Sequence, residues 1–150
     1  MAYNTLKLHF CYQYRAIVNN IMIKLLTGEN TYKLNNYLNA KIAEFLVEFP
    51  EGLEKFEAIE LNDKDQVLDA VRSISFLSPR KLIVVEDYFQ NKDLVSITQQ
   101  LVEQCSDTTD LYIVDTKPDK RLSEYKLLVK LSELIDFKKD SQEGLTSWMI

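Results

Sequence analysis

Short apolar segments alternate along the chain with longer segments in which apolar residues recur every three or four positions. The short segments are rich in Ile, Leu and Val, which is typical of strands. Two of them, 82–85 and 111–114, are continuous apolar runs, as expected for strands that are covered on both faces. The predicted strands span residues 22–27, 56–61, 82–85, 111–114 and 134–137.

The longer segments between these strands have the period of amphipathic helices. Asn30 and Thr31 offer N-cap chemistry before the first helix, and Pro50 and Gly52 end it. Asn62 and Asp63 can cap the second, residues 91–104 form the third, and Pro118 with Asp119 opens the fourth. The apolar stripes are Leu34, Leu38, Ile42, Phe45, Leu46 and Phe49; Val67, Leu68, Val71 and Ile74; Leu94, Ile97, Leu101 and Val102; and Leu122, Tyr125, Leu128 and Val129.

The alternation of five strands with four helices predicts an α/β domain in residues 22–140, with a parallel sheet and helices on both faces. Residues 1–21 lack a clear period and form an N-terminal extension. It is either a non-native leader before a natural start at Met22, or an extra strand or helix on the domain edge. Residues 141–150 begin another helix and stop at an apolar cluster, which suggests a truncated second, helical domain.

Composition and charge narrow the class of protein. A length of 150 residues with 46% hydrophobic residues suits one globular domain. The net charge is −5, and no run of Lys and Arg exceeds two residues. This argues against a dedicated nucleic-acid binder, although DNA contact through a local patch or through partners stays open.

The chain shows no pattern for disulfides, metal binding or membrane insertion. Cys11 and Cys105 are far apart, and His9 is the single histidine. A zinc site, a disulfide framework and a histidine-based triad are therefore not expected. No apolar run reaches bilayer length, and the first residues do not resemble a signal peptide, so we expect a cytoplasmic protein without a cofactor.

A parallel sheet invites a search for a nucleotide site. The turn after the first strand, Gly28-Glu29-Asn30-Thr31-Tyr32-Lys33-Leu34, has one Gly only, and Leu34 stands where a magnesium-binding Ser or Thr is needed. Glu29 would place a negative charge beside the phosphates. Glu86 and Asp87 imitate the acidic pair of an NTPase, but they lack a phosphate cradle and are expected to be solvated residues at the end of a strand.

Three segments together resemble the bacterial DNA polymerase III delta subunits. The first is the strand and turn from Leu25 to Tyr32. The second is residues 72–85, in which a helix is followed by Ser75-Phe76-Leu77-Ser78-Pro79-Arg80 and then by an apolar strand. The third begins at Lys117-Pro118-Asp119-Lys120-Arg121. The closing segment 145–150 resembles the entry of that family into its second domain, so the resemblance covers residues 22–150.

The resemblance implies a degenerate AAA+ (RecA-like) first domain that lacks a phosphate-binding loop, with Gly28, Glu29 and Asn30 as the remnant of a nucleotide site. It implies a non-catalytic clamp-loader subunit of the DNA polymerase III holoenzyme, a DNA-directed DNA polymerase (nucleotidyltransferase) complex that acts in DNA replication. Its expected partners are the beta sliding clamp, which it binds and opens, and the clamp-loader ATPase and delta-prime subunits, which it contacts through a helical lid and collar beyond this chain. DNA binding would be weak or indirect.

The resemblance also assigns a binding site. Phe76 and Leu77 would insert into a hydrophobic pocket of the clamp, flanked by Ser75, Ser78 and Pro79. Arg80 would either position the loop or pair with clamp carboxylates, unless it is simply a solvated charge.

Other interpretations remain open on the residues alone. A Phe-Leu pair after a helix is more often part of the domain's own core than of a binding site. The alternative function is a divergent nucleotide-binding, P-loop-like domain with NTPase activity. A response-regulator-like domain ranks last, because only Asp87 is placed near a phosphoacceptor position.

Overall fold

Five short strands form one parallel sheet in residues 22–139, the part of the chain that the computed structural model describes. The strands are β1 (Ile23–Thr27), β2 (Leu53–Glu57), β3 (Lys81–Glu86), β4 (Thr109–Asp115) and β5 (Glu133–Asp136). Their order in the sheet is β2-β3-β4-β1-β5, and every neighbouring pair is parallel. The prediction of a five-stranded parallel α/β sheet is confirmed.

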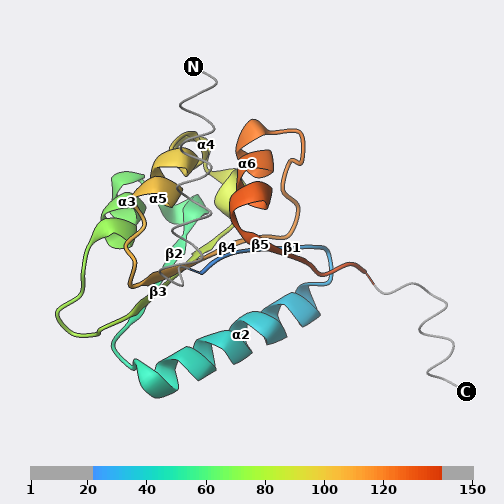
Figure 1. Ribbon diagram of the computed structural model, residues 1–150. Coiled ribbons are helices and arrows are strands. Elements are labelled where there is room, and N and C mark those ends of the chain that lie inside the picture. Colours follow the sequence, from blue (N-terminus) through green and yellow to red (C-terminus); the bar gives the residue numbers. More distant parts are fainter. Residues whose placement is uncertain (1–21, 140–150) are drawn as a thin grey trace, which may run out of the picture.

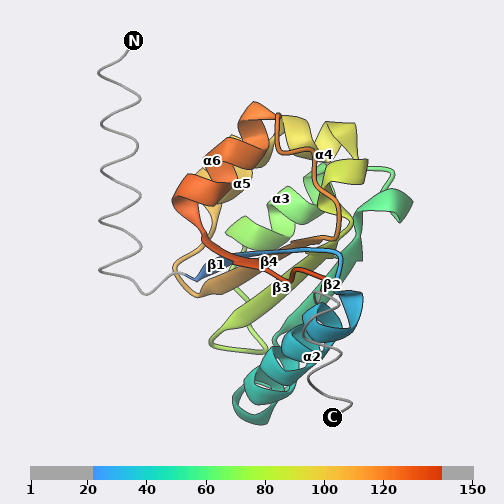
Figure 2. The ribbon, with the colours of Figure 1, turned by 90° about the vertical axis from the view of Figure 1, so that its right-hand side faces the viewer.

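Helices cover both faces of this sheet, as predicted (Figures 1 and 2). The long helix α2 (Thr31–Glu48) lies on one face. On the other face lie α3 (Asp65–Arg72), α4 (Lys92–Ser96), α5 (Thr98–Gln104) and α6 (Ser123–Leu131). Because α2 carries the chain from β1 past β4 and β3 to the edge strand β2, the direction of chain progression reverses between β1 and β4.

The core consists of two layers, one on each side of the sheet. Alternate residues of the central strands point to opposite faces, as the pleat requires. Leu25, Ile83, Val85, Leu111 and Ile113 pack beneath α3 to α6. Leu26, Leu82, Val84, Tyr112 and Val114 pack against the stripe of α2, of which Leu34, Leu38 and Ile42 are buried.

Several predicted boundaries were wrong. The strand predicted at 56–61 is β2 at Leu53–Glu57, followed by the 3-10 turn η1 (Ala58–Glu60). The helix predicted at 91–104 is two helices, because the backbone of Ile97 departs from helical geometry between α4 and α5. The helix predicted to open at Pro118 and Asp119 begins at Ser123, after a loop in which the Asp119 carboxylate accepts a hydrogen bond from the backbone N–H of Arg121.

The expectations for residues 1–21 and 141–150 lie outside the described residues. None of the helices within residues 22–139 is long and apolar enough to cross a bilayer.

Candidate functional site

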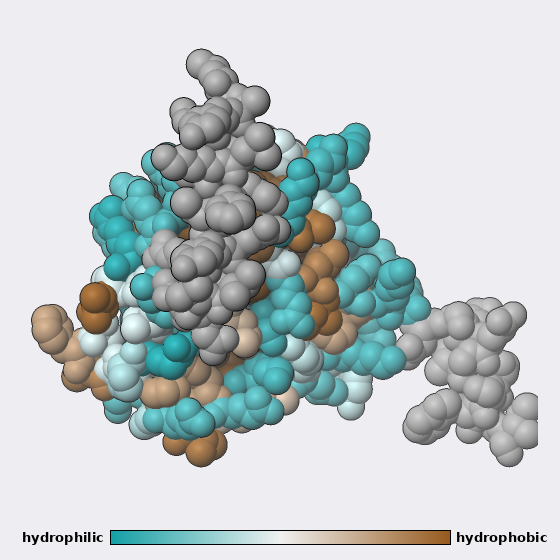
Figure 3. Space-filling model, in the orientation of Figure 1, coloured by the Kyte–Doolittle hydropathy of each residue, from teal (hydrophilic) through white to brown (hydrophobic). Residues whose placement is uncertain are grey.

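The loop between α3 and β3, residues 73–80, carries three large apolar side chains that are exposed and close together in the sequence. Phe76 is fully exposed, and Leu77 and Ile74 are 79% and 76% exposed. We call these three residues the apolar tip. In Figure 3, hydrophobic atoms project from the side of the molecule on which Figure 1 shows the α3–β3 loop. The exposure of Phe76 and Leu77 excludes the interpretation that this pair belongs to the domain core.

Ile74 was predicted to lie on the buried stripe of the second helix, and this was wrong. Helix α3 ends at Arg72, and Ser73 is extended. The hydroxyl of Ser73 donates to the carbonyl of Ala70 at 3.3 Å, which satisfies one of the last helical carbonyls. The chain therefore leaves the helix one residue before Ile74, and this side chain joins Phe76 and Leu77 on the surface.

Ser75 and Ser78 hold the backbone of the loop by local hydrogen bonds. The Ser75 hydroxyl oxygen accepts hydrogen bonds from the N–H groups of Leu77 and Ser78, at 3.1 and 3.3 Å. Ser78 is buried, and its hydroxyl donates to the carbonyl of Arg80 at 2.5 Å. Short local bonds of this kind fix a turn without help from helix or sheet, so the apolar tip is presented by an ordered backbone.

An ion pair ties the end of the loop to the next strand of the sheet. The Arg80 guanidinium donates to Asp110 Oδ1 at 2.7 Å, and both side chains are partly buried. Arg80 is therefore not a solvated charge, in contrast to one of the expectations. Pro79, beside it, is exposed.

Lys81, the first residue of β3, ties the start of the loop to the sheet. It is 4% exposed, and its ammonium group donates to the carbonyl of Ala70 at 2.6 Å and to the hydroxyl of Ser73 at 2.9 Å. Glu54 of β2 lies 3.5 Å from it. The sequence analysis did not identify Lys81 or Asp110 as residues of this site. For Lys81, the available signal was a lysine at the first position of an otherwise apolar strand.

We expect Lys81→Met to lower the free energy of unfolding by about 1–3 kcal/mol, because the helix-end carbonyl and Ser73 lose a buried donor. Urea denaturation followed by circular dichroism measures the change. Lys130→Met removes an exposed lysine from the last turn of α6 and serves as the control. Equal stability of the two variants would contradict a role of Lys81 in holding the loop.

The partly buried carboxyl of Asp110 makes the stability of the domain depend on pH. Burial raises the pKa of Asp110 above its usual value of 3.8, and the charge and hydrogen bond of Arg80 offset part of this rise. A raised pKa means that the folded state holds the proton more tightly than the unfolded state. The contribution of Asp110 to stability therefore falls as the pH rises from about 3.8 through the folded-state pKa.

We expect Arg80→Met to raise the pKa of Asp110 further, because the lost guanidinium is a charge that favours the carboxylate. A carboxyl-detected NMR titration of both proteins measures this pKa. A lower pKa of Asp110 in the variant would contradict the pairing. Arg121→Met, which removes an exposed arginine paired with Asp119, should leave Asp110 unchanged.

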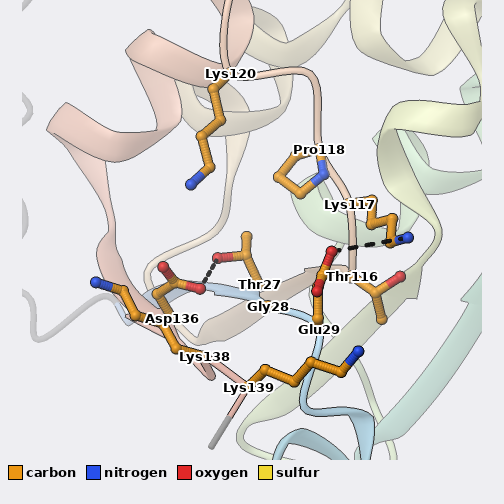
Figure 4. A pocket seen from close by; sticks show the side chains of 10 residues that line it. All are labelled: Thr27, Gly28, Glu29, Thr116, Lys117, Pro118, Lys120, Asp136, Lys138 and Lys139. Atoms are coloured by element: carbon orange, nitrogen blue, oxygen red, sulfur yellow. Dashed lines mark hydrogen bonds and ion pairs between the residues drawn. The ribbon is translucent and has the colours of Figure 1, made fainter. Parts of the chain in front are cut away.

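The second candidate location is a pocket of about 400 Å³ at the carboxyl ends of β1, β4 and β5. Figure 4 shows it, and we call it the strand-end pocket. Its lining residues are Thr27, Gly28, Glu29, Thr116, Lys117, Pro118, Lys120, Asp136, Lys138 and Lys139.

Where a phosphate-binding loop would lie, the turn after β1 is closed by the chain that follows β5. Gly28 has φ +122°, and a Cβ atom there would overlap the carbonyl group of Phe137. Phe137 donates its N–H to the carbonyl of Thr27 at 2.7 Å, and its carbonyl accepts the N–H of Asn30 at 3.0 Å. The glycine of this turn therefore serves the close approach of two backbone segments.

The N–H groups of Thr31 and Lys33, at the start of α2, are likewise engaged within the protein. The N–H of Thr31 donates to the carbonyl of Glu29, and the N–H of Lys33 donates to the side-chain oxygen of Asn30, which is the N-cap. These are the groups that cradle phosphates in P-loop proteins. Of the three residues predicted as a nucleotide-site remnant, Gly28 and Glu29 line the pocket and Asn30 does not.

The acidic pair at the end of β3 is not brought to this pocket. Glu86 and Asp87 are partly buried, and neither lines it. Asp87 has φ +55°, and its carbonyl accepts the N–H of Gln90 in the following turn. Within residues 22–139 there is no group of three or more His, Cys, Asp or Glu side chains placed to hold a metal ion.

Both the sequence and the fold of this chain are similar to those of known proteins. The sequence profile of the family described as DNA polymerase III, delta subunit, matches residues 24–138. No curated protein matches the sequence significantly.

Many solved structures share the fold, and two of them serve as examples. The Bacillus subtilis DNA clamp loader delta protein (YqeN) has a TM-score of 0.63 and 18% sequence identity, covering 95% of this chain and 46% of that chain. This chain thus spans about half the length of the Bacillus protein. A chain in the structure of Drosophila ORC bound to DNA has a TM-score of 0.50 and 14% identity, covering 89% of this chain and 93% of that chain.

Proposed function

Because this chain belongs to the DNA polymerase III delta subunit family, a clamp-loader component, we propose that it binds the beta sliding clamp through its apolar tip. Phe76 and Leu77 supply the main contacts in this proposal, and Ile74 extends the surface beside them. The observation that supports it is the high exposure of two large apolar side chains on a loop held at both ends by buried or partly buried polar contacts.

Physical chemistry favours such a loop as a binding element. Apolar side chains that stay in water when the domain folds retain their full transfer free energy for an interface. The hydrogen bonds of Ser75 and Ser78 already fix the backbone, so little ordering entropy is lost on binding. Arg80 and Lys81 then act as positioning residues rather than as contacts to the clamp.

Opening of the clamp is the finer part of the proposal. A ring interface shifts toward its open state only as far as the bound protein prefers that state. Two or three apolar side chains can supply a preference of this kind when the pocket of the clamp that receives them is better formed in the open ring. The ATPase and delta-prime subunits are proposed partners through parts of the protein outside this chain, and DNA contact is weak or indirect.

We propose no catalysis for this domain and place it in the cytoplasm, where bacterial replication occurs. The alternative of an NTPase is disfavoured by the engaged N–H groups at the start of α2 and by the approach of Phe137 to Gly28. Hydrolysis would also need the acidic pair near the phosphates, and Glu86 and Asp87 do not line the strand-end pocket.

Isothermal titration of the purified chain with the beta clamp tests the proposal. We expect saturable binding that does not require ATP. Absence of binding, or binding that appears only with a nucleotide present, would refute it.

A further inference from the structure

The strand-end pocket lies where the topology of the sheet opens a crevice. Chain progression reverses between β1 and β4, because α2 leaves β1 on one face and α6 leaves β4 on the other. The two connections diverge at this point, and ligands of open α/β sheets commonly bind in such a crevice at the carboxyl ends of the strands. The pocket is lined by the end of β1 and the turn after it (Thr27, Gly28 and Glu29) and by four residues that follow β4 (Thr116, Lys117, Pro118 and Lys120).

This pocket is positively charged in a chain whose net charge is −5. Four lysines and two carboxylates line it, which leaves a formal charge of +2. Both carboxylates already have partners. Glu29 lies 3.8 Å from the ammonium of Lys117, and Asp136 accepts a hydrogen bond of 3.4 Å from Thr27.

The other three lysines have no ion pair with a carboxylate of residues 22–139. Figure 4 shows Lys120 extending from the β4–α6 loop, and Lys138 and Lys139 lying after β5 on the other side of Thr27 and Gly28. Like charges gathered around a cavity repel one another, and a bound anion would relieve this repulsion. The cluster thus favours occupation by a negatively charged group.

We propose that the strand-end pocket binds a phosphate group through Lys120, Lys138 and Lys139. An ammonium is a point charge with donors in three directions, which suits a tetrahedral anion approached from several sides. No arginine lines the pocket, so its cationic contacts would come from ammonium groups. A dianion or larger polyanion also balances a charge of +2, whereas one carboxylate does not.

Binding in this pocket would differ from binding by a P-loop. The lysine side chains would supply the contacts, because the N–H groups of Asn30, Thr31 and Lys33 are engaged within the protein. We propose no hydrolysis of the bound phosphate compound, because the acidic pair Glu86 and Asp87 does not line the pocket. The phosphate could belong to a free polyphosphate compound or to a nucleic-acid backbone.

The first experiment is isothermal titration of the purified chain with inorganic pyrophosphate at low ionic strength. We expect saturable binding that weakens as salt is added. The triple variant Lys120→Gln/Lys138→Gln/Lys139→Gln should bind on the order of tenfold more weakly or worse, because charged contacts to the phosphate are lost. Circular dichroism verifies that the variant is folded.

The matched control is Lys55→Gln/Lys126→Gln/Lys130→Gln, which removes the same charge from exposed positions away from the pocket. We expect its affinity for pyrophosphate to change by about twofold at most, as for distant screened charges. Equal losses in the two triple variants would mean that only net charge matters, and would overturn the proposal. Failure of the wild-type chain to bind would overturn it as well.

Glu29 provides a test with the opposite sign. Glu29→Gln removes a carboxylate from the pocket and releases Lys117 from its ion pair. We expect pyrophosphate to bind a few-fold more tightly to this variant, by the loss of like-charge repulsion. Weaker binding by the variant would contradict a phosphate at this position.

A single-stranded oligonucleotide distinguishes the two sources of phosphate. If the oligonucleotide binds, depends on the same three lysines and is displaced by pyrophosphate, the nucleic-acid backbone is the source. If pyrophosphate alone depends on these lysines, the source is a small phosphate compound. A variant with Ala at Phe76 and Leu77 should bind pyrophosphate normally, which separates this proposal from the clamp-binding proposal.

Discussion

The double substitution Phe76→Ala/Leu77→Ala is expected to reduce affinity for the beta clamp about 30- to 700-fold while leaving the fold intact. Burial of these two side chains in a partner could contribute roughly 2–4 kcal/mol, which gives this range at about 1.4 kcal/mol per tenfold. Because both side chains are already in water, truncating them creates no cavity in the domain. Isothermal titration with the clamp measures the loss, and urea denaturation measures stability.

The matched control is Val47→Ala/Ile59→Ala. These side chains are 84% and 67% exposed and belong to α2 and to the η1 turn, away from the loop. The control should bind the clamp with wild-type affinity. If both double variants bind equally well, the apolar tip is not the binding element, and the proposed function fails at its central point.

Gly28→Ala should lower the free energy of unfolding by about 3 kcal/mol or more, the largest effect on stability that we expect from one methyl group in this domain. Two causes act together. The backbone of Gly28 has φ +122°, which residues with a Cβ rarely adopt, and the added Cβ would overlap the backbone carbonyl of Phe137. Neither backbone segment can move away cheaply, because Thr27 and Asn30 are hydrogen-bonded to Phe137 on either side.

Urea denaturation of Gly28→Ala measures this loss. Glu29→Ala changes the adjacent, exposed residue, and its stability should lie within about 0.5 kcal/mol of the wild type. A Gly28→Ala variant as stable as Glu29→Ala would show that the turn can relax, and that the close approach of Phe137 is not a fixed part of the fold.

The sequence predicted the central strands well because their signal is local. In β3 and β4, nearly every residue is buried, so a continuous apolar run marks the strand by itself. The edge strand β2 has no such signal, since most of its residues are exposed. Its position is set by pairing with β3, where Leu53 lies opposite Leu82, and the apolar residues at 58–61 belong to the following turn.

The end of α3 shows a second limit of local patterns. Ile74 continues the helical period of Val67 and Val71, yet the helix stops at Arg72. One contact at this end comes from Lys81, a residue of the next strand that binds the carbonyl of Ala70. A contact across the loop cannot be read from the periodicity of the helix, which is why Ile74 was assigned to the core.

The break between α4 and α5 likewise lies beside a contact with another element, which the helical period does not reveal. The hydroxyl of Thr98 donates to the carbonyl of Val95 and also pairs with the buried hydroxyl of Tyr88 at 2.6 Å. Burial raises the pKa of Tyr88 well above its ordinary range. The phenol therefore stays protonated and can take part in the hydrogen bond with the Thr98 hydroxyl. The apolar stripe is still buried on both sides of the break, and so the pattern predicted the packing face correctly and the continuity wrongly.

The closure of the β1–α2 turn by Phe137 also limits how a phosphate-binding loop could be built into this domain. A phosphate-binding loop needs several free N–H groups and room for an anion between the first strand and its helix. Making that room would displace the Phe137 carbonyl and loosen the end of β5 from β1. Substitution of Glu29 or Leu34 alone would leave the Phe137 carbonyl in place, so single substitutions of these residues cannot create a phosphate-binding loop at this turn.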